Sequence, residues 1–201
     1  MRWSDAHATV EAVRRQTQLW LPALSLRRGF SATRTEHLLN GLVAAMPADE
    51  LYLEVGSLEG RTLESAAHGN DTKHLVACDP GAKYQSVVAG MPLNVEFHAA
   101  GWETVLPDLT KPVGCCFYDA DHSADATGDF LHAVTPRLAD EAVVVLDDWD
   151  RVSVRDGAFA AMAADPRWQV LREMPEYGDG LTCPPNHFGH FFGCAVLGWK
   201  R

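Results

Sequence analysis

From Leu51 onward, short apolar runs rich in β-branched residues alternate with segments of helical periodicity. This alternation is typical of βαβ units, which fold into a parallel sheet with helices on both faces. We therefore predict a doubly wound, mostly parallel α/β fold of the Rossmann-like type. The predicted parallel strands are 51–55, 74–78, 94–98, 113–118 and 142–146, with helices starting near Arg61, Gln85, Glu103, Asp125 and Asp156. The tail adds runs 168–174 and 190–199, which we predict to form an antiparallel edge.

A chain of 201 residues is long enough for one ordinary domain with a full core. Residues 1–48 carry two helical patterns, which we predict to form a cap before the main sheet. Residues 51–150 form the expected cofactor and metal core, and residues 151–201 the last helix and edge strands. The prediction is a single domain over 1–201.

The net charge of the chain limits the kinds of ligand that it is expected to bind. Lys and Arg total 17 against 27 for Asp and Glu, so the chain is acidic. Nucleic acids and anionic membranes favour basic surfaces, and we expect neither as a partner. The opening residues lack the apolar core of a signal peptide, and no later run is long and apolar enough to span a bilayer. We expect a cytoplasmic protein with a small-molecule substrate.

The five cysteines show no paired metal-ligand spacing. Cys115 and Cys116 fall inside a predicted buried strand. We interpret all five as reduced thiols, most of them in the core.

The run from Leu51 to Ala67 places glycines at a strand-to-helix turn, where the backbone can approach a ligand closely. The next strand ends in Asp79, about 20 residues further on, where a carboxylate can accept hydrogen bonds from a ribose diol. Together these features indicate an adenosine-type cofactor. The alternative is that the glycines serve only strand–helix packing. The candidate cofactor-binding residues of the two strand ends are Glu54, Gly56, Ser57, Gly60, Thr62 and Asp79.

A nicotinamide dinucleotide would be expected to need the three-glycine G-x-G-x-x-G loop. The spacing here is E-x-G-x-x-x-G-x-T, and it resembles the first motif of class I S-adenosylmethionine-dependent methyltransferases. The resemblance implies that Glu54, Gly56 and Ser57 line the methionine moiety and that Asp79 holds the ribose. Trp102 stands where many relatives place a residue that contacts the adenine ring. Its indole suits either stacking on the adenine or packing in the core.

Acidic residues close two further strands. Asp119 follows run 113–118, and Asp147 and Asp148 follow run 142–146. If these strands are neighbours, the carboxylates lie at one edge and repel each other unless a cation neutralises them. Oxygen ligands favour a hard ion, Mg²⁺ first, with Mn²⁺ or Ca²⁺ as alternatives. The other interpretation is that the acids cap the following helices and face solvent.

Both acidic runs resemble the metal-dependent O-methyltransferases, which include catechol, caffeoyl-CoA and macrocin-type enzymes. The resemblance implies that Asp119, Asp147 and Asp148 are metal ligands, and we count Asp119 among the cofactor-binding residues as well. His122, in Asp119-Ala-Asp-His122, stands where several members place a catalytic lysine. We therefore predict that His122 is the general base.

The resulting hypothesis is an S-adenosylmethionine-dependent O-methyltransferase in which a divalent metal chelates a hydroxylated small molecule and His122 removes the hydroxyl proton. The alternatives are a metal-independent methyltransferase and a non-catalytic adenosine-binding module. The sequence does not choose among sugar hydroxyls, catechols and phenols as acceptors. His187 and His190 suit either an aromatic wall over a substrate or a packed strand entrance. A homodimer contact is open through the apolar residues Leu19, Trp20, Leu21, Leu24 and Leu26.

Overall fold

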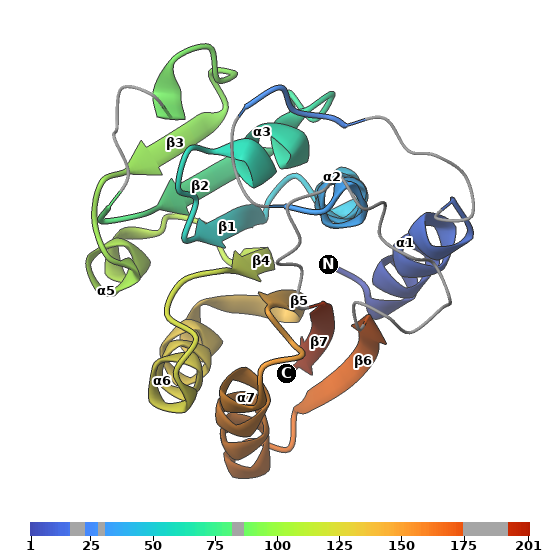
Figure 1. Cartoon of the computed structure of the whole chain (residues 1–201), viewed down its shortest axis with the longest axis vertical. Helices are drawn as coiled ribbons and strands as arrows, with labels where there is room; N and C mark the ends of the chain where they lie inside the picture. The colour runs from blue at the N-terminus through green and yellow to red at the C-terminus, as the bar shows by residue number, and fades with distance from the viewer. Residues whose placement is uncertain (17–22, 28–30, 82–86, 175–192) are drawn as a thin grey trace.

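The computed structural model describes residues 1–16, 23–27, 31–81, 87–174 and 193–201. One seven-stranded sheet organises them, in the order β3-β2-β1-β4-β5-β7-β6 (Figure 1). The first five strands are parallel, and β7 runs antiparallel to both β5 and β6. The strands are β1 (Leu51–Val55), β2 (His74–Cys78), β3 (Val95–His98), β4 (Val113–Tyr118), β5 (Leu138–Asp147), β6 (Trp168–Met174) and β7 (Cys194–Lys200).

The predicted α/β class, the parallel core and the antiparallel edge are all confirmed. β1, β2, β4 and β6 have the predicted bounds, whereas β5 begins at Leu138, four residues earlier than predicted. Leu138 and Ala139 are buried, so the apolar run that defines this strand extends past the exposed Asp140. The start of the last predicted strand, residues 190–192, lies outside the described residues.

Helices cover both faces of the sheet. The α-helices are α1 (Trp3–Gln16), α2 (Thr33–Ala45), α3 (Arg61–Ala67), α5 (Trp102–Val105), α6 (Ala124–Val134) and α7 (Val152–Ala164), with 3-10 turns η1 (Leu106–Asp108) and η2 (Thr135–Arg137). The start of the helix predicted near Gln85 lies outside the described residues. None of the described helices has the length and apolar character needed to cross a membrane.

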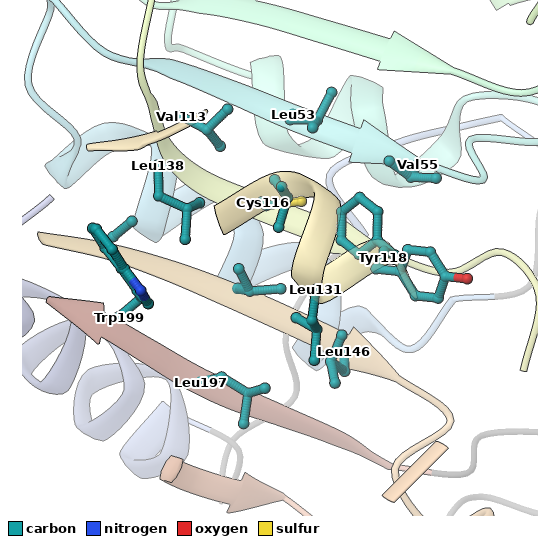
Figure 2. Packing of buried hydrophobic residues seen from close by; sticks show 14 of the residues in the cluster. Leu53, Val55, Val113, Cys116, Tyr118, Leu131, Leu138, Leu146, Leu197 and Trp199 are labelled. Carbon is teal, nitrogen blue, oxygen red and sulfur yellow. The ribbon is translucent and has the colours of Figure 1, made fainter. Parts of the chain in front are cut away.

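Alternate residues of each strand feed two hydrophobic clusters, one on each face. Leu53 and Val55 of β1 pack with α5, α6 and α7, whereas Tyr52 packs with α1, α2 and α3. Figure 1 shows these two groups of helices on opposite sides of the sheet. The N-terminal helices therefore form part of a face layer, continuous with α3. Figure 2 shows the first cluster, which includes Cys116 and Tyr118 of β4 and Leu131 of α6.

Four of the five cysteines lie in the described residues, and all four are free and buried. Burial raises the pKa of Cys78 and that of Cys115 to about 12, so both remain thiols at neutral pH. The predicted reduced core thiols are confirmed for Cys78, Cys115, Cys116 and Cys194; Cys183 lies outside the described residues.

Candidate active site

A cavity of about 910 Å³ opens at the carboxyl ends of β1, β2 and β4. Ligands of open α/β sheets bind at this edge. Of the predicted cofactor residues, Gly56, Ser57, Thr62, Asp79, Trp102 and Asp119 line the cavity. The predicted base and the other two predicted metal ligands, His122, Asp147 and Asp148, line it as well.

The turn after β1 is held by close packing of backbone against backbone. Gly56 has φ of +92°, and a Cβ there would lie 1.8 Å from the carbonyl oxygen of Asp119. Only glycine allows this approach, which brings the ends of β1 and β4 together. Gly60 also has a positive φ, but its neighbours are the Met91 and Val87 side chains, and it does not line the cavity.

Asp79 supports the same turn from β2. One carboxylate oxygen accepts a hydrogen bond from the Leu58 N–H at 2.7 Å, and the other accepts from the Gly81 N–H at 2.7 Å. Each oxygen keeps a second lone pair. Asp79 can thus order the loop and still accept a hydrogen bond from a ligand in the cavity.

Glu54 differs from the expectation that it lines the methionine moiety. The side chain is fully buried and lies outside the cavity wall. Its carboxylate accepts hydrogen bonds from the Tyr52 hydroxyl at 2.7 Å and the Thr62 hydroxyl at 2.9 Å. Burial raises the pKa of Glu54 to about 7, although these hydrogen bonds oppose the shift. Glu54 therefore acts on the cavity through Thr62.

Ser57 and Trp102 present two different surfaces to the cavity. The Ser57 hydroxyl is buried, and within the described residues no partner meets hydrogen-bond geometry, although it lies near enough to Glu54 to lower that pKa. Trp102 lines the cavity and also packs edge-on against Phe130, with ring centroids 5.7 Å apart. Trp102 therefore packs in the core, as one of the two interpretations expects. It also lines the cavity, so stacking on an adenine stays a prediction.

The two acidic strand ends meet as the sequence predicted. β4 and β5 are neighbours, with Tyr118 opposite Leu146, so Asp119 and Asp147 follow them at the same edge. Burial raises the pKa of Asp147 well above its ordinary value, and the charges of Asp119 and Asp148 add to the effect. Burial likewise raises the pKa of Asp148, which has a positive φ of 53°.

His122 lies between these acids. Its Nε2 is 3.4 Å from Asp119 Oδ1 and 3.1 Å from Asp148 Oδ2. The hydrogen bond with Asp119 and the charge of Asp148 raise the pKa of His122, and burial opposes the rise. Donation from Nε2–H to the carboxylates leaves Nδ1 as the acceptor nitrogen of the neutral ring.

Arg151 is a site residue that the sequence reasoning missed. Its Nε donates to Asp148 Oδ2 at 2.7 Å, so the Arg151 guanidinium neutralises that carboxylate, and His122 contacts the same oxygen. The spacing of three residues between Asp148 and Arg151 is a signal that could have suggested the pair. Arg61 and Tyr118 also line the cavity without having been predicted.

The structure does not show the predicted metal site of Asp119, Asp147 and Asp148, and the metal stays a prediction. Within the described ranges, no group of three His, Cys, Asp or Glu side chains is arranged to hold a metal ion. Oδ2 of Asp148 already contacts Arg151 at 2.7 Å and His122 at 3.1 Å. His187 and His190 lie outside the described residues.

One family model matches the central part of the chain. Residues 53–149, which run from β1 to just beyond β5, match the family described as a methyltransferase domain. No curated protein sequence matches the chain at a significant level.

Solved structures with the same fold cover nearly the whole chain. An O-methyltransferase from Bacillus cereus in complex with SAH has a TM-score of 0.65 at 18% identity, over 98% of this chain and 91% of its own. The O-methyltransferase TomG from Streptomyces achromogenes, involved in tomaymycin synthesis and bound to SAM, has 0.63 at 18%, over 98% and 90%. Cofactor-bound Rv0187 from MTB has 0.63 at 20%, over 99% and 89%. At these identities the likeness concerns the fold.

Proposed function

We propose that this chain is a class I S-adenosylmethionine-dependent methyltransferase, which transfers the methyl group of the cofactor to an oxygen atom of a small hydroxylated molecule. The observation that carries the choice of oxygen is His122, held between Asp119 and Asp148 at the cavity wall. A hydroxyl becomes a good nucleophile when it loses its proton, and an imidazole beside carboxylates accepts that proton readily.

The residues of the cavity suit the cofactor. The Gly56 turn admits a ligand close to the backbone, Ser57 lines the cavity beside it, and Asp79 keeps acceptor capacity for a ribose. When bound, S-adenosylmethionine supplies an electrophilic methyl group on a sulfonium. The protein's own contribution is to orient the acceptor oxygen and to take up its proton at His122 Nδ1.

The screen that tests this proposal uses S-adenosylmethionine with a labelled methyl group and a panel of diols, catechols, phenols and sugars. Matched amines serve as controls. We expect label in hydroxylated acceptors only. Transfer confined to the amines would contradict the choice of oxygen and leave the fold assignment intact.

His122→Ala should lower kcat on such an acceptor by about 10²- to 10⁴-fold, the usual contribution of a general base. Binding of S-adenosylhomocysteine should change little, because the base acts on the acceptor. His132→Ala is the matched control, since His132 is exposed on α6. A His122→Ala protein that turns over at the wild-type rate with a lowered thermal midpoint would show that His122 has a structural role only.

A divalent cation is the second candidate feature of this site. The observation that favours it is Asp147, a partly buried carboxylate whose pKa is raised by burial and by the charges of Asp119 and Asp148. Against it, Arg151 already neutralises Asp148, so we derive no step through a metal.

Removal of metal ions with EDTA distinguishes a metal-independent enzyme from a metal-dependent one. If Arg151 supplies the compensating charge, turnover in excess EDTA should remain within about twofold of the untreated rate, less than the loss of one charged contact would cause. A loss of activity that Mg²⁺ restores would instead establish the metal-dependent form. Arg151→Met, measured alongside, should reduce turnover only in the metal-independent case.

A further inference from the structure

Most of the charged side chains in the cavity wall are acidic, whereas Arg61 is basic. In the described part of the chain, seven carboxylate side chains and two arginines line it. A ligand that carries a carboxylate would be repelled by such a surface unless a cation meets it. The arginines are therefore the groups that decide where an anionic end of a ligand can lie.

The two arginines differ in their contacts and in the end of the cavity at which they lie. Arg151 donates to Asp148 at 2.7 Å and lies beside His122, where the proposed function places the acceptor. Arg61 begins α3 directly after the turn that carries Gly56 and Ser57. Its position belongs to the cofactor end of the cavity.

Arg61 is held rigidly by a buried acid from another element. Its Nε donates to Glu36 Oε1 of α2 at 2.7 Å, and its Nη1 donates to the Arg27 carbonyl at 3.2 Å. Glu36 is fully buried, and its other oxygen accepts from the Leu24 N–H at 3.0 Å. Among the described residues, Nη2 of Arg61 has no partner, and 23% of the side chain remains exposed.

We propose that Arg61 binds the α-carboxylate of the cofactor's methionine through its outer amino group, and that Glu36 is the positioning residue for this contact. A guanidinium fixed at two donors loses little entropy when a third engages a carboxylate. The inference rests on the proposed function for the identity of the cofactor. It adds the group by which the cavity distinguishes an amino-acid-bearing nucleoside from one that lacks the carboxylate.

Calorimetry with two ligands isolates this contact. The probes are S-adenosylhomocysteine and its decarboxylated analogue, which keeps the amine and lacks only the carboxylate. Wild type should prefer the carboxylated ligand by about 10- to 100-fold, as expected for one charged hydrogen-bonded contact. Arg61→Met should weaken binding of S-adenosylhomocysteine by a similar factor and leave the analogue within about twofold, because only the charged contact is lost.

Three further variants test the interpretation. Arg14→Met removes a charge of the same kind from an exposed position on α1, outside the cavity. This variant should bind both ligands as wild type does. Glu36→Gln should reduce the preference for the carboxylated ligand only in part, because Arg61 keeps its charge but loses its fixed geometry. Arg61→Lys, the variant least disturbing to the fold, should also give an intermediate preference.

Equal weakening of both ligands by Arg61→Met, or no weakening of either, would overturn the role of Arg61 while leaving the cofactor assignment intact. Failure of wild type to bind S-adenosylhomocysteine at all would overturn the proposed function, and this inference with it. The two failures are therefore distinguishable in the same titrations.

Discussion

At the residue scale, Glu54 is a motif residue that the sequence identified and that the structure places behind the cavity wall. The acidic residue before the glycine turn was identified from its spacing, but a spacing does not state which way a strand residue points. In the sheet, Glu54 shares its face with Tyr52, whose hydroxyl takes up one of its oxygens. The other oxygen holds Thr62 at the start of α3, so the acid ties strand to helix behind the cavity.

The raised pKa of Glu54 makes stability depend on pH. Its folded pKa of about 7 exceeds the ordinary 4.5, so folding takes up a proton between these values. Stability therefore falls as pH rises through that window, by about 3 kcal/mol for a fully buried group. Glu54→Gln imitates the protonated acid and should lose this dependence.

Thermal midpoints of wild type and Glu54→Gln, measured from pH 4.5 to 8, check the effect. We expect the variant to gain several degrees relative to wild type across the window. A constant difference between the two proteins over this range would show that Glu54 titrates normally.

At the element scale, the turn between β1 and α3 sets the geometry of the site. The sequence identified this turn from its glycines, and both Gly56 and Gly60 have positive φ. Which glycine faces the cavity could not be read from spacing, because that depends on contacts with β4 and with the Met91 side chain. The strand bounds were more predictable, because an uninterrupted apolar run is itself the signature of a strand buried on both faces.

Gly56→Ala tests the close approach of β1 and β4. A methyl group there would overlap the Asp119 carbonyl and would also hold a positive φ, so we expect a loss of about 3 to 5 kcal/mol in unfolding free energy. Gly69→Ala is the matched control, because Gly69 has a φ of +69° with nothing within 4 Å of the added carbon. It should cost only about 1–2 kcal/mol, the strain of a positive φ.

Urea denaturation of both variants measures these differences. Similar losses for the two glycines would mean that contact with Asp119 does not constrain the turn.

At the scale of the whole molecule, the sheet order brings distant strand ends to one edge. The sequence predicted that Asp119 and Asp147 would share an edge if their strands were neighbours, and β4 and β5 are neighbours. Asp79, at the end of β2, lines the same cavity. What the pattern could not predict are pairings between helices and loops, such as Glu36 with Arg61. Such pairs have no fixed spacing, since they depend on how α2 packs against α3. The sequence likewise did not predict the ion pair between Asp148 and Arg151.

The central claim is that the edge cavity is built for S-adenosylmethionine, and titration calorimetry with S-adenosylhomocysteine and NAD tests it most directly. We expect saturable one-to-one binding of S-adenosylhomocysteine and none of NAD. Asp79→Ala should weaken S-adenosylhomocysteine by about tenfold or more, because the ribose and the Leu58 turn lose their acceptor. Tight binding of NAD, or unchanged affinity in a folded Asp79→Ala protein, would contradict the account.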